Sequence, residues 1–376
     1  MLPENTPSSS SSCLLHSNLW FYLWIPLLTS SLSKRITLAE AHNINTNSIM
    51  LPIELDLSSP SSSYHHHFLS PPSPSPRCSA PDSTLNFRPV IGILSHPGDG
   101  ASGRLKNGTN VSYIASSYVK FVESAGARVI PLIYTDPLHI LLDKLELVNG
   151  VLFTGGWAKR GLYFEVVREI FKRVLEKNDA GQFFPCYAIC LGFELLTMII
   201  SKDNNILESF SASYQPSTLQ FVKNININGT VFQRFPPELL RKLNTDCLVM
   251  QNHKYGLSPE TLQGNQRLSS FFNILTTSTD RDDKVYVSTV QAQHYPITAF
   301  QWHPEKNAFE WGYAMIPHSE DAIQVTQHVA NSFISEARKS PNRPPARDVL
   351  ENVIYNYSPT YCGKQGRGYD EVYIFA

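Results

Sequence analysis

Short apolar runs alternate with amphipathic segments from about residue 88 onward, and this alternation predicts a sheet covered by helices. Runs of strand length lie at 89–94, 128–133, 150–153 and 185–189. Apolar residues recur at helical spacing at 112–125, 137–147 and 162–176, and again directly after Cys190. Strands that alternate with helices in this way form a parallel sheet with helices on both faces, so we expect an α/β fold.

The pattern shifts toward β structure after about residue 215. Strand candidates lie at 221–222, 247–250, 272–275, 285–290 and 297–302. A short helix is expected to begin at 235–240, where prolines near its start suit the first helical turn, and a last helix is expected at 319–337. The sequence contains no internal repeat, and we expect one folded domain at 87–338.

The segments that flank this domain differ from it in composition. Residues 31–86 are rich in Ser and Pro and cannot bury enough apolar surface to offset their ordering entropy, so we expect them to be disordered. A histidine triplet at 65–67 lies inside this stretch, and we interpret it as inert. Residues 339–376 form a C-terminal tail whose tyrosines predict packing on the domain.

The longest apolar run, at 14–28, predicts a signal peptide over residues 1–30. The run is too short and too interrupted to span a bilayer, and serines follow it. Glu4 precedes the run and the basic pair Lys34-Arg35 follows it, which leaves a signal anchor or an unrelated extension as alternatives. We expect entry into the secretory pathway, no stable membrane insertion after processing, and a destination in the vacuole or the extracellular space and cell wall.

Composition narrows the classes of partner and cofactor. Charged residues make up 17% of the chain and the formal net charge is -1, which excludes the electrostatic footprint of a nucleic-acid-binding protein. The six cysteines show no metal-type clustering, so we expect neither a metal site nor a disulfide-built domain. Four Asn-X-Ser/Thr tripeptides are compatible with glycosylation in the secretory pathway, at Asn107, Asn110, Asn228 and Asn356.

Cys190 stands between an apolar run of strand length and a helix-forming segment. The succession predicts a strand, a sharp turn and a helix, with the thiol at the apex of the turn. A helix N-terminus favours the thiolate, and the backbone N–H of Leu191 would face a developing oxyanion. A cysteine at the end of a buried strand is by itself more often structural, so the assignment requires partners.

Two further strand ends carry polar chemistry, Thr154-Gly155-Gly156 and the segment 301–305. Functional groups in such a fold collect beyond the carboxyl ends of the strands. A thiol nucleophile needs a base, and the base needs a third group that fixes its orientation. His303 and Glu305 lie on one side of an extended chain and supply both, so the sequence predicts a Cys-His-Glu catalytic set.

These residues also carry a family resemblance. The segments 190–192 and 300–305 resemble the Cys-His-Glu pattern of class I glutamine amidotransferase-like proteins. A finer resemblance, to the γ-glutamyl hydrolase family and its plant members, covers roughly residues 88–335. It rests on the segments 117–129, 153–156, 190–196, 253–258 and 301–311. The resemblance implies an α/β fold with a mixed, mostly parallel sheet flanked by helices, a flavodoxin-like sandwich with a cysteine nucleophile elbow.

The family implies an omega peptidase that cleaves γ-glutamyl bonds of folylpoly-γ-glutamates and antifolate polyglutamates. Hydrolysis would pass through a γ-glutamyl thioester on Cys190 and release glutamate or short poly-γ-glutamates, with no cofactor and no metal. It also implies a homodimer, while folylpolyglutamate is the expected small-molecule partner and nucleic acid is not.

The resemblance implies roles for individual residues of this chain. Cys190 would be the nucleophile, His303 the general base and Glu305 the third member of the triad. His253, Glu194 and Tyr118 match further active-site positions, and Gly156 and Leu191 would supply backbone N–H groups to the oxyanion. Three nearby cations could meet substrate carboxylates, Lys159, Arg160 and Lys254, although such side chains are more often solvated, and we do not count them among the site residues.

Two alternatives stay open from the sequence. The first is a glutaminase or amidotransferase-type domain on the same fold, although no synthetase is fused to this chain. The second is a catalytically inactive binding protein, whose hallmark would be a broken triad. Cys190, His303 and Glu305 are all present, which favours an enzyme.

Overall fold

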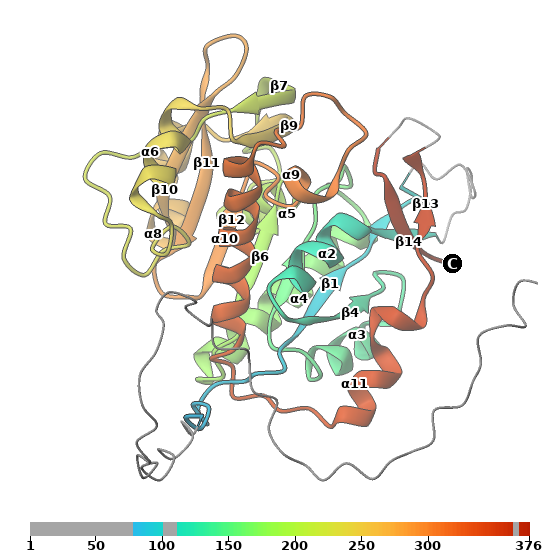
Figure 1. Ribbon diagram of the computed structural model, residues 1–376. Coiled ribbons are helices and arrows are strands. Elements are labelled where there is room, and N and C mark those ends of the chain that lie inside the picture. The colour runs from blue at the N-terminus through green and yellow to red at the C-terminus, as the bar shows by residue number, and fades with distance from the viewer. Residues whose placement is uncertain (1–77, 101–110, 364–367) are drawn as a thin grey trace, which may run out of the picture. The chain divides into compact units, whose positions relative to one another are not determined.

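The computed structural model of the protein describes residues 78–100, 111–363 and 368–376 (Figure 1). Its strands are β1 (Val90–Leu94), β2 (His96–Pro97), β3 (Ser112–Ala115), β4 (Arg128–Leu132), β5 (Val151–Phe153), β6 (Cys186–Ile189), β7 (Glu208–Ser217), β8 (Gln220–Phe221), β9 (Val249–Gly256), β10 (Phe272–Thr279), β11 (Val285–Ala292), β12 (Ile297–Phe300), β13 (Thr360–Tyr361) and β14 (Glu371–Phe375). Its helices are α2 (Ser116–Ser124), α3 (Leu138–Leu145), α4 (Leu162–Asp179), α5 (Leu191–Ser201), α6 (Pro237–Thr245), α7 (Pro259–Gly264), α8 (Gln266–Phe271), α9 (Lys306–Phe309), α10 (Glu320–Ala337), α11 (Ala346–Asn352) and the 3₁₀ turn η1 (Ile354–Asn356).

An eight-stranded sheet with the order β4-β1-β5-β6-β12-β11-β10-β8 forms the centre of the protein. The neighbours from β4 to β12 are parallel, and the remaining pairs are antiparallel. Side chains of a strand alternate between the two faces, so Val90 and Leu94 enter one core while Ile91 and Ile93 enter the other. The mixed, mostly parallel sheet confirms the predicted fold class.

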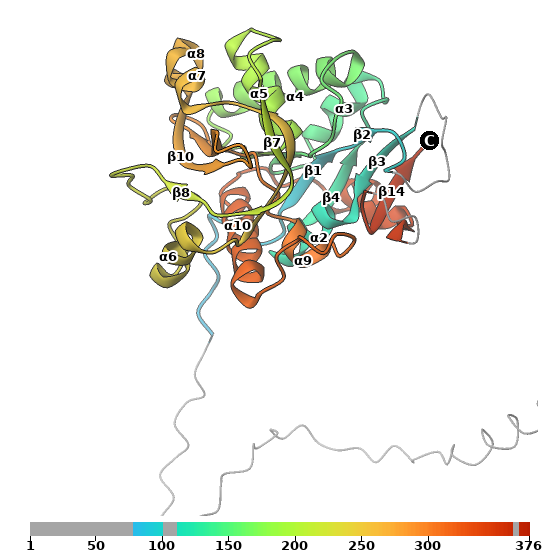
Figure 2. The ribbon, with the colours of Figure 1, turned by 90° about the horizontal axis from the view of Figure 1, so that it is seen from above.

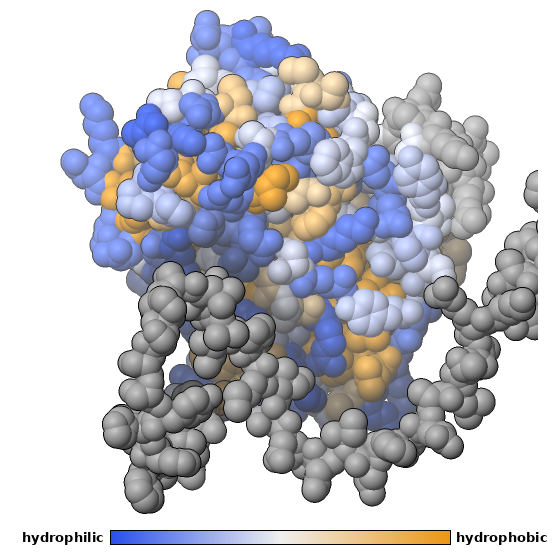
Figure 3. All heavy atoms as spheres, viewed as in Figure 1, coloured by the Kyte–Doolittle hydropathy of each residue, from blue (hydrophilic) through white to orange (hydrophobic). Residues whose placement is uncertain are grey.

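Helices cover both faces of this sheet, as Figure 2 shows from above. The first core packs α3, α4 and α5 on one face together with α7 and α8. The second core packs α2, α6 and α10 on the opposite face. On the face seen in Figure 3, hydrophilic residues predominate and hydrophobic ones lie in small groups between them. The apolar periodicity of the helices is therefore explained by burial against the sheet.

The strands and helices of the α/β half lie where the apolar pattern predicts them, with one exception. The segment 112–125, expected to be entirely helical, begins as strand β3 and turns into α2 only at Ser116. β3 pairs with β2 on one side and with the C-terminal strand β14 on the other. Pairing with a strand at the far end of the chain overrides the local helical pattern, and no local signal reveals it.

The C-terminal segment packs on the domain, as its aromatic residues predicted. β14 runs antiparallel to β3 in a four-stranded sheet with the order β13-β14-β3-β2. Val372 and Phe375 of β14 are buried, and Val349 of α11 joins the core on the α3 face. The folded unit also includes Asn86, which is buried, accepts the N–H of Arg88 and donates its own N–H to the carbonyl of Arg338.

Several predictions fall on residues outside those described. They are the signal peptide at 1–30, most of the Ser/Pro-rich segment with its histidine triplet, and the sequons at Asn107 and Asn110. Localisation and a homodimer stay predictions. Within the described ranges, none of the helices combines the length and the apolar character needed to cross a bilayer.

Candidate active site

Cys190 occupies a strained turn between β6 and α5. Its φ of 51° and ψ of -103° lie in the left-handed half of conformational space, which residues with a Cβ rarely adopt. The Cys190 N–H donates to the carbonyl of Phe300 at 2.7 Å and ties the turn to β12. At Gly192 a Cβ would lie 2.7 Å from the carbonyl oxygen of Phe153, so only glycine lets α5 start this close to β5. The predicted strand, turn and helix are confirmed.

The thiol of Cys190 is buried, and its electrostatic surroundings differ from the expectation. Burial raises the pKa of the thiol, and the Glu194 carboxylate raises it further, while Lys159 and the Leu191 N–H act in the opposite direction. Burial therefore favours the protonated thiol, in contrast to the helix N-terminus, which favours the thiolate. A resting thiol makes a neighbouring base necessary.

His303 and Glu305 form a buried pair after β12. His303 Nδ1 lies 2.8 Å from Glu305 Oε1. The backbone N–H of His303 donates to the backbone carbonyl of Met250 at 2.9 Å. Burial lowers the pKa of His303, and the carboxylate opposes this shift. Burial opposes ionisation of Glu305, yet the hydrogen bond from His303, and its charge when protonated, hold the pKa of this carboxyl below its usual value. The geometry thus suits a neutral imidazole that donates from Nδ1 and has Nε2 available as a base.

Cys190, His303 and Tyr118 meet around Gly155. A Cβ at Gly155 would lie 2.8 Å from the Tyr118 hydroxyl, 2.9 Å from His303 Cε1 and 3.4 Å from Cys190 Cβ. The Tyr118 hydroxyl accepts the Gly155 N–H at 2.8 Å. Burial and the Glu305 charge raise the pKa of Tyr118 well above its usual value, so the hydroxyl stays neutral. Tyr118 thereby uses the N–H of Gly155, and Gly156 remains as the predicted oxyanion donor in this loop.

A cavity of about 500 Å³ opens in front of this group. Cys190, His303 and Gly156 lie on its wall together with Lys306. The Lys306 ammonium lies 4.9 Å from the ring centre of Tyr369 and makes no ion pair within the part of the chain that the structure describes. Three tyrosines from distant segments complete the wall, Tyr214, Tyr313 and Tyr369. The cavity therefore combines a thiol, a base, a cation and aromatic rings.

Glu194 lies buried beside the nucleophile rather than on the cavity wall. Its Oε2 pairs with Lys159 Nζ at 2.7 Å, and its Oε1 accepts from Gln301 Nε2 at 3.4 Å. Burial raises the pKa of Glu194, and Lys159 opposes the shift. Gln301 Nε2 also lies 4.0 Å from Cys190 Sγ. Lys159, considered above for substrate carboxylates, is therefore engaged with Glu194, and sequence reasoning gave Gln301 no role of its own.

His253 is buried and does not line the cavity. Its Nδ1 lies 2.9 Å from the carbonyl oxygen of Tyr255, and its ring packs edge-on against Tyr286 at 4.7 Å. Burial lowers the pKa of His253 to about 3, with a contribution from the charge of His303. The side chain is therefore neutral with its proton on Nδ1, while its buried Nε2 has no partner among the described residues. Its neighbour Asn252, and not His253, lies on the cavity wall.

Comparison with known proteins decides the family of this chain. The sequence pattern of peptidase C26 matches residues 89–305. The chain belongs to the peptidase C26 family. Gamma-glutamyl hydrolase 2 of Arabidopsis thaliana is 63% identical over 95% of this chain and 98% of its own. Gamma-glutamyl hydrolase 1 of the same plant is 68% identical over 80% and 86%. The gamma-glutamyl hydrolase of Mus musculus is 36% identical over 80% and 94%.

The resemblance to plant γ-glutamyl hydrolases is thereby confirmed. Among solved structures, a glutamine amidotransferase of Thermotoga maritima matches with a TM-score of 0.38 and 15% identity, over 68% of this chain and 100% of its own. That likeness is too low to bear on the site. The fold assignment depends on the strand order and the helix layers described above.

The peptidase C26 fold of this chain also contains a buried histidine that sequence reasoning missed. His96 Nε2 accepts the backbone N–H groups of Trp157 and Ala158 at 3.0 and 3.2 Å, and Nδ1 donates to the carbonyl of Pro97 at 2.9 Å. Burial lowers the pKa of His96 to about 4. A Cβ at Gly156 would lie 2.3 Å from the His96 ring. His96 thus supports the Gly156 loop from behind, and a lone histidine before Pro97 carries no sequence signal for that role.

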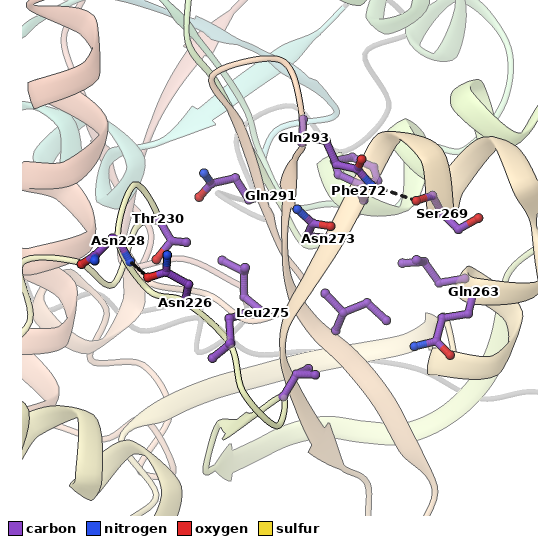
Figure 4. Close-up of a pocket in the computed structure, with 15 residues that line it drawn as sticks. Asn226, Asn228, Thr230, Gln263, Ser269, Phe272, Asn273, Leu275, Gln291 and Gln293 are labelled. Atoms are coloured by element: carbon purple, nitrogen blue, oxygen red, sulfur yellow. Dashed lines mark hydrogen bonds between the residues drawn. The ribbon is translucent and has the colours of Figure 1, made fainter.

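A second cavity, of about 570 Å³, has no comparable chemistry (Figure 4). Amide side chains such as Asn226, Asn273 and Gln291 surround it, and no cysteine or histidine lies on its wall. Within the described residues no group of three or more His, Cys, Asp or Glu side chains is placed to hold a metal ion. The cavity at Cys190 is therefore the candidate active site of this peptidase C26 member.

Proposed function

We propose that this peptidase C26 member is a cysteine-dependent hydrolase that cleaves γ-glutamyl bonds, with folylpoly-γ-glutamates as substrates. The observation that carries the proposal is that Cys190 and His303 share one cavity wall, while Nδ1 of His303 is bonded to Glu305. Relatives named gamma-glutamyl hydrolase support the type of bond that is cleaved.

The resting protonation states define the first chemical step. The thiol is protonated and His303 is neutral, so Nε2 of His303 takes the thiol proton while Sγ of Cys190 attacks the γ-carbonyl carbon. The carboxylate of Glu305 stabilises the imidazolium that forms. The carbonyl oxygen becomes an oxyanion that the N–H groups of Gly156 and Leu191 would meet.

The remaining steps use the same groups and water. His303 returns the proton to the amine nitrogen of the departing glutamate, the C–N bond breaks, and a γ-glutamyl thioester remains on Cys190. A water molecule gives its proton to His303 and attacks the thioester carbon. The departing sulfur of Cys190 takes that proton from His303 as the C–S bond breaks, and the carboxylic acid leaves.

Charge in the cavity supports a substrate with carboxylates. Each γ-linked glutamate carries a free α-carboxylate, and a cation in a poorly solvated cavity attracts such a group. Lys306 is 4% exposed and projects into the cavity beside Tyr369. We propose that its ammonium binds an α-carboxylate next to the scissile bond.

Product analysis tests the proposal. Purified protein and its Cys190→Ala variant are incubated with pteroylpentaglutamate at mildly acidic pH, and the products are separated by chromatography. Shortened folates from the wild type alone are expected, and equal products from both proteins contradict the nucleophile assignment. Glutamine serves as the control substrate, because ammonia release from glutamine with intact folate favours an amidotransferase-type domain. No reaction with either substrate favours a binding protein.

A further inference from the structure

Two tyrosines stand together on the wall of the active-site cavity. Tyr214 belongs to β7 and Tyr313 to the loop between α9 and α10. Their ring centres lie 4.7 Å apart with the planes inclined by 48°. The Tyr313 hydroxyl also accepts the N–H of Gly368 at 3.3 Å. Tyr214 is nevertheless 43% exposed, so this pair presents aromatic surface to whatever enters the cavity.

The backbone of Tyr214 is strained. Its φ is 52°, although it is not a glycine, and it lies where the pairing of β7 with β9 shifts register between Ala212 and Gln215. The Tyr214 N–H donates to Asn252 Oδ1 at 3.2 Å, and its carbonyl accepts from Arg281 at 3.3 Å. Strain of this kind persists only where surrounding bonds enforce it, and it concentrates at functional sites.

The strained residue is connected to the nucleophile. Asn252 also lines the cavity. Its side-chain Oδ1 accepts the Tyr214 N–H, and its backbone carbonyl oxygen lies 3.9 Å from Cys190 Sγ. The backbone that carries the exposed ring is therefore bonded to a residue that contacts the thiol. A bulky ring held rigidly at a cavity wall gives a stacking partner at low entropic cost.

The chemistry of the substrate offers a matching group. In a γ-glutamyl group bound at Cys190, the α-nitrogen lies only a few covalent bonds from the carbonyl that is attacked. An aryl amide on that nitrogen would reach the wall of a cavity of about 500 Å³, while the α-carboxylate faces the cation Lys306.

We propose that Tyr214, supported by Tyr313, is a binding subsite for an aromatic group attached to the α-nitrogen of the γ-glutamyl residue that is transferred to Cys190. This inference rests on the proposed function. It makes Tyr214 a specificity-determining residue that selects arylated acyl groups over plain ones.

Paired substrates test the subsite. The rate constant kcat/KM is measured for N-(4-aminobenzoyl)-γ-glutamylglutamate and for its N-acetyl counterpart, which lacks the ring. Tyr214→Ala is expected to lower the ratio of the two kcat/KM values, aryl over acetyl, roughly tenfold, since an aromatic pair contributes about that factor. Tyr214→Phe should keep most of the preference. Tyr355→Ala, which removes a tyrosine that is 62% exposed outside the cavity, is the matched control. An aryl preference that survives Tyr214→Ala in a folded protein overturns the inference.

A binding measurement separates failure of the inference from failure of the proposed function. Calorimetry compares the affinity of the aryl substrate for Cys190→Ala with that for the Cys190→Ala, Tyr214→Ala double variant. A roughly tenfold weaker affinity of the double variant supports the subsite even if the wild type hydrolyses neither substrate, which would refute only the hydrolase. Equal affinities overturn the subsite.

Discussion

Strained backbones and buried side chains occur together at the candidate active site. Cys190 and Tyr214 both have left-handed backbones without being glycine, and both lie on the wall of one cavity. Such a conformation costs about 1–3 kcal/mol, so the surrounding hydrogen bonds must enforce it. His303 and Tyr118 are buried, and each is oriented by a hydrogen bond, to Glu305 and from the Gly155 N–H respectively. Hydrogen bonds therefore fix the orientation of these two side chains.

Removal of Glu305 should cost less activity than removal of the nucleophile. Glu305→Ala takes away the acceptor that holds His303 Nδ1 at 2.8 Å, but it leaves the base and the thiol in place. We expect turnover to remain about a hundredfold above that of Cys190→Ala, since orienting groups are worth less than the groups they orient. Steady-state kinetics on both variants, with circular dichroism to verify folding, measures this. Equal inactivity of the two folded variants would contradict the ranking.

His96 should make stability depend on pH in a defined window. In the unfolded chain this histidine takes up a proton below its ordinary pKa of 6.5, whereas in the folded protein it does so only near pH 4. Its contribution to stability is complete above pH 6.5 and is lost as the pH falls, by about 3 kcal/mol at pH 4.

The His96→Gln variant isolates this effect, because Gln keeps an acceptor for the Trp157 N–H and does not titrate. Urea unfolding of both proteins at a series of pH values between 7 and 4 gives the difference in stability. We expect any advantage of the wild type at pH 7 to shrink steadily toward pH 4. A difference that is constant over this range would show that His96 does not remain neutral in the fold.

The close packing of α5 against β5 sets the geometry of the turn at Cys190. α5 begins directly after Cys190 and lies against β5, where a Cβ at Gly192 would lie 2.7 Å from the Phe153 carbonyl oxygen. β6 and β12 run parallel beside each other, so Cys190 and the segment that carries His303 leave the sheet at the same edge. The turn is thus shaped by its neighbours as well as by its own residues.

Gly192→Ala should therefore disturb both stability and catalysis. The added methyl meets a backbone atom, which cannot move aside without shifting α5 from β5, and we expect a loss of about 1–3 kcal/mol. Turnover should fall together with stability, because the Cys190 turn moves with the helix.

Gly264→Ala is the matched control. A Cβ at Gly264 meets no atom within 4 Å, so this variant should differ from the wild type by less than about 0.5 kcal/mol and keep full activity. Thermal unfolding and kinetics on the two variants measure the contrast. A Gly192→Ala protein as stable and active as Gly264→Ala would refute the close-approach argument.

At the scale of the whole molecule, segments from both ends of the described chain complete the domain. The C-terminal strand β14 extends the small sheet through β3, and Tyr369 just before it reaches the cavity wall. Near the other end, Asn86 donates its N–H to the Arg338 carbonyl at 2.6 Å and its side-chain amide to Asn149 Oδ1 at 3.1 Å. The active site is thus one part of a fold that joins distant segments.

The position of the N-terminal boundary can be tested by truncation. A protein that starts at Cys78 retains Asn86 and should be folded and active. A protein that starts at Phe87 loses the hydrogen bonds of Asn86 to Arg338 and Asn149, and each lost bond costs about 0.5–1.5 kcal/mol. Melting temperatures and turnover of the two proteins decide the question. Equal melting temperatures would place Asn86 outside the cooperative unit.

Much of the fold and part of the site could be read from local pattern. The apolar runs that became β1, β4, β5 and β6 are buried on both faces, so their hydrophobicity alone predicts them. The candidate catalytic residues are recognisable locally as well, since Cys190 ends a strand and His303 with Glu305 follows another. β7 and the helices α7 and α8 were not foreseen, because their polar sequences owe their form to pairing and capping.

The sequence by itself determined the parallel core, the turn at Cys190 and the identity of the His303–Glu305 pair, because each depends on residues close together in the chain. Only the tertiary structure decided the burial that raises the pKa of the Cys190 thiol, the engagement of Lys159 with Glu194 and the support of the Gly156 loop by His96. It also decided the tyrosine wall built from Tyr214, Tyr313 and Tyr369. Those features arise from burial and from contacts between segments far apart in the chain, and the hydrophobic periodicity of a sequence indicates neither of them.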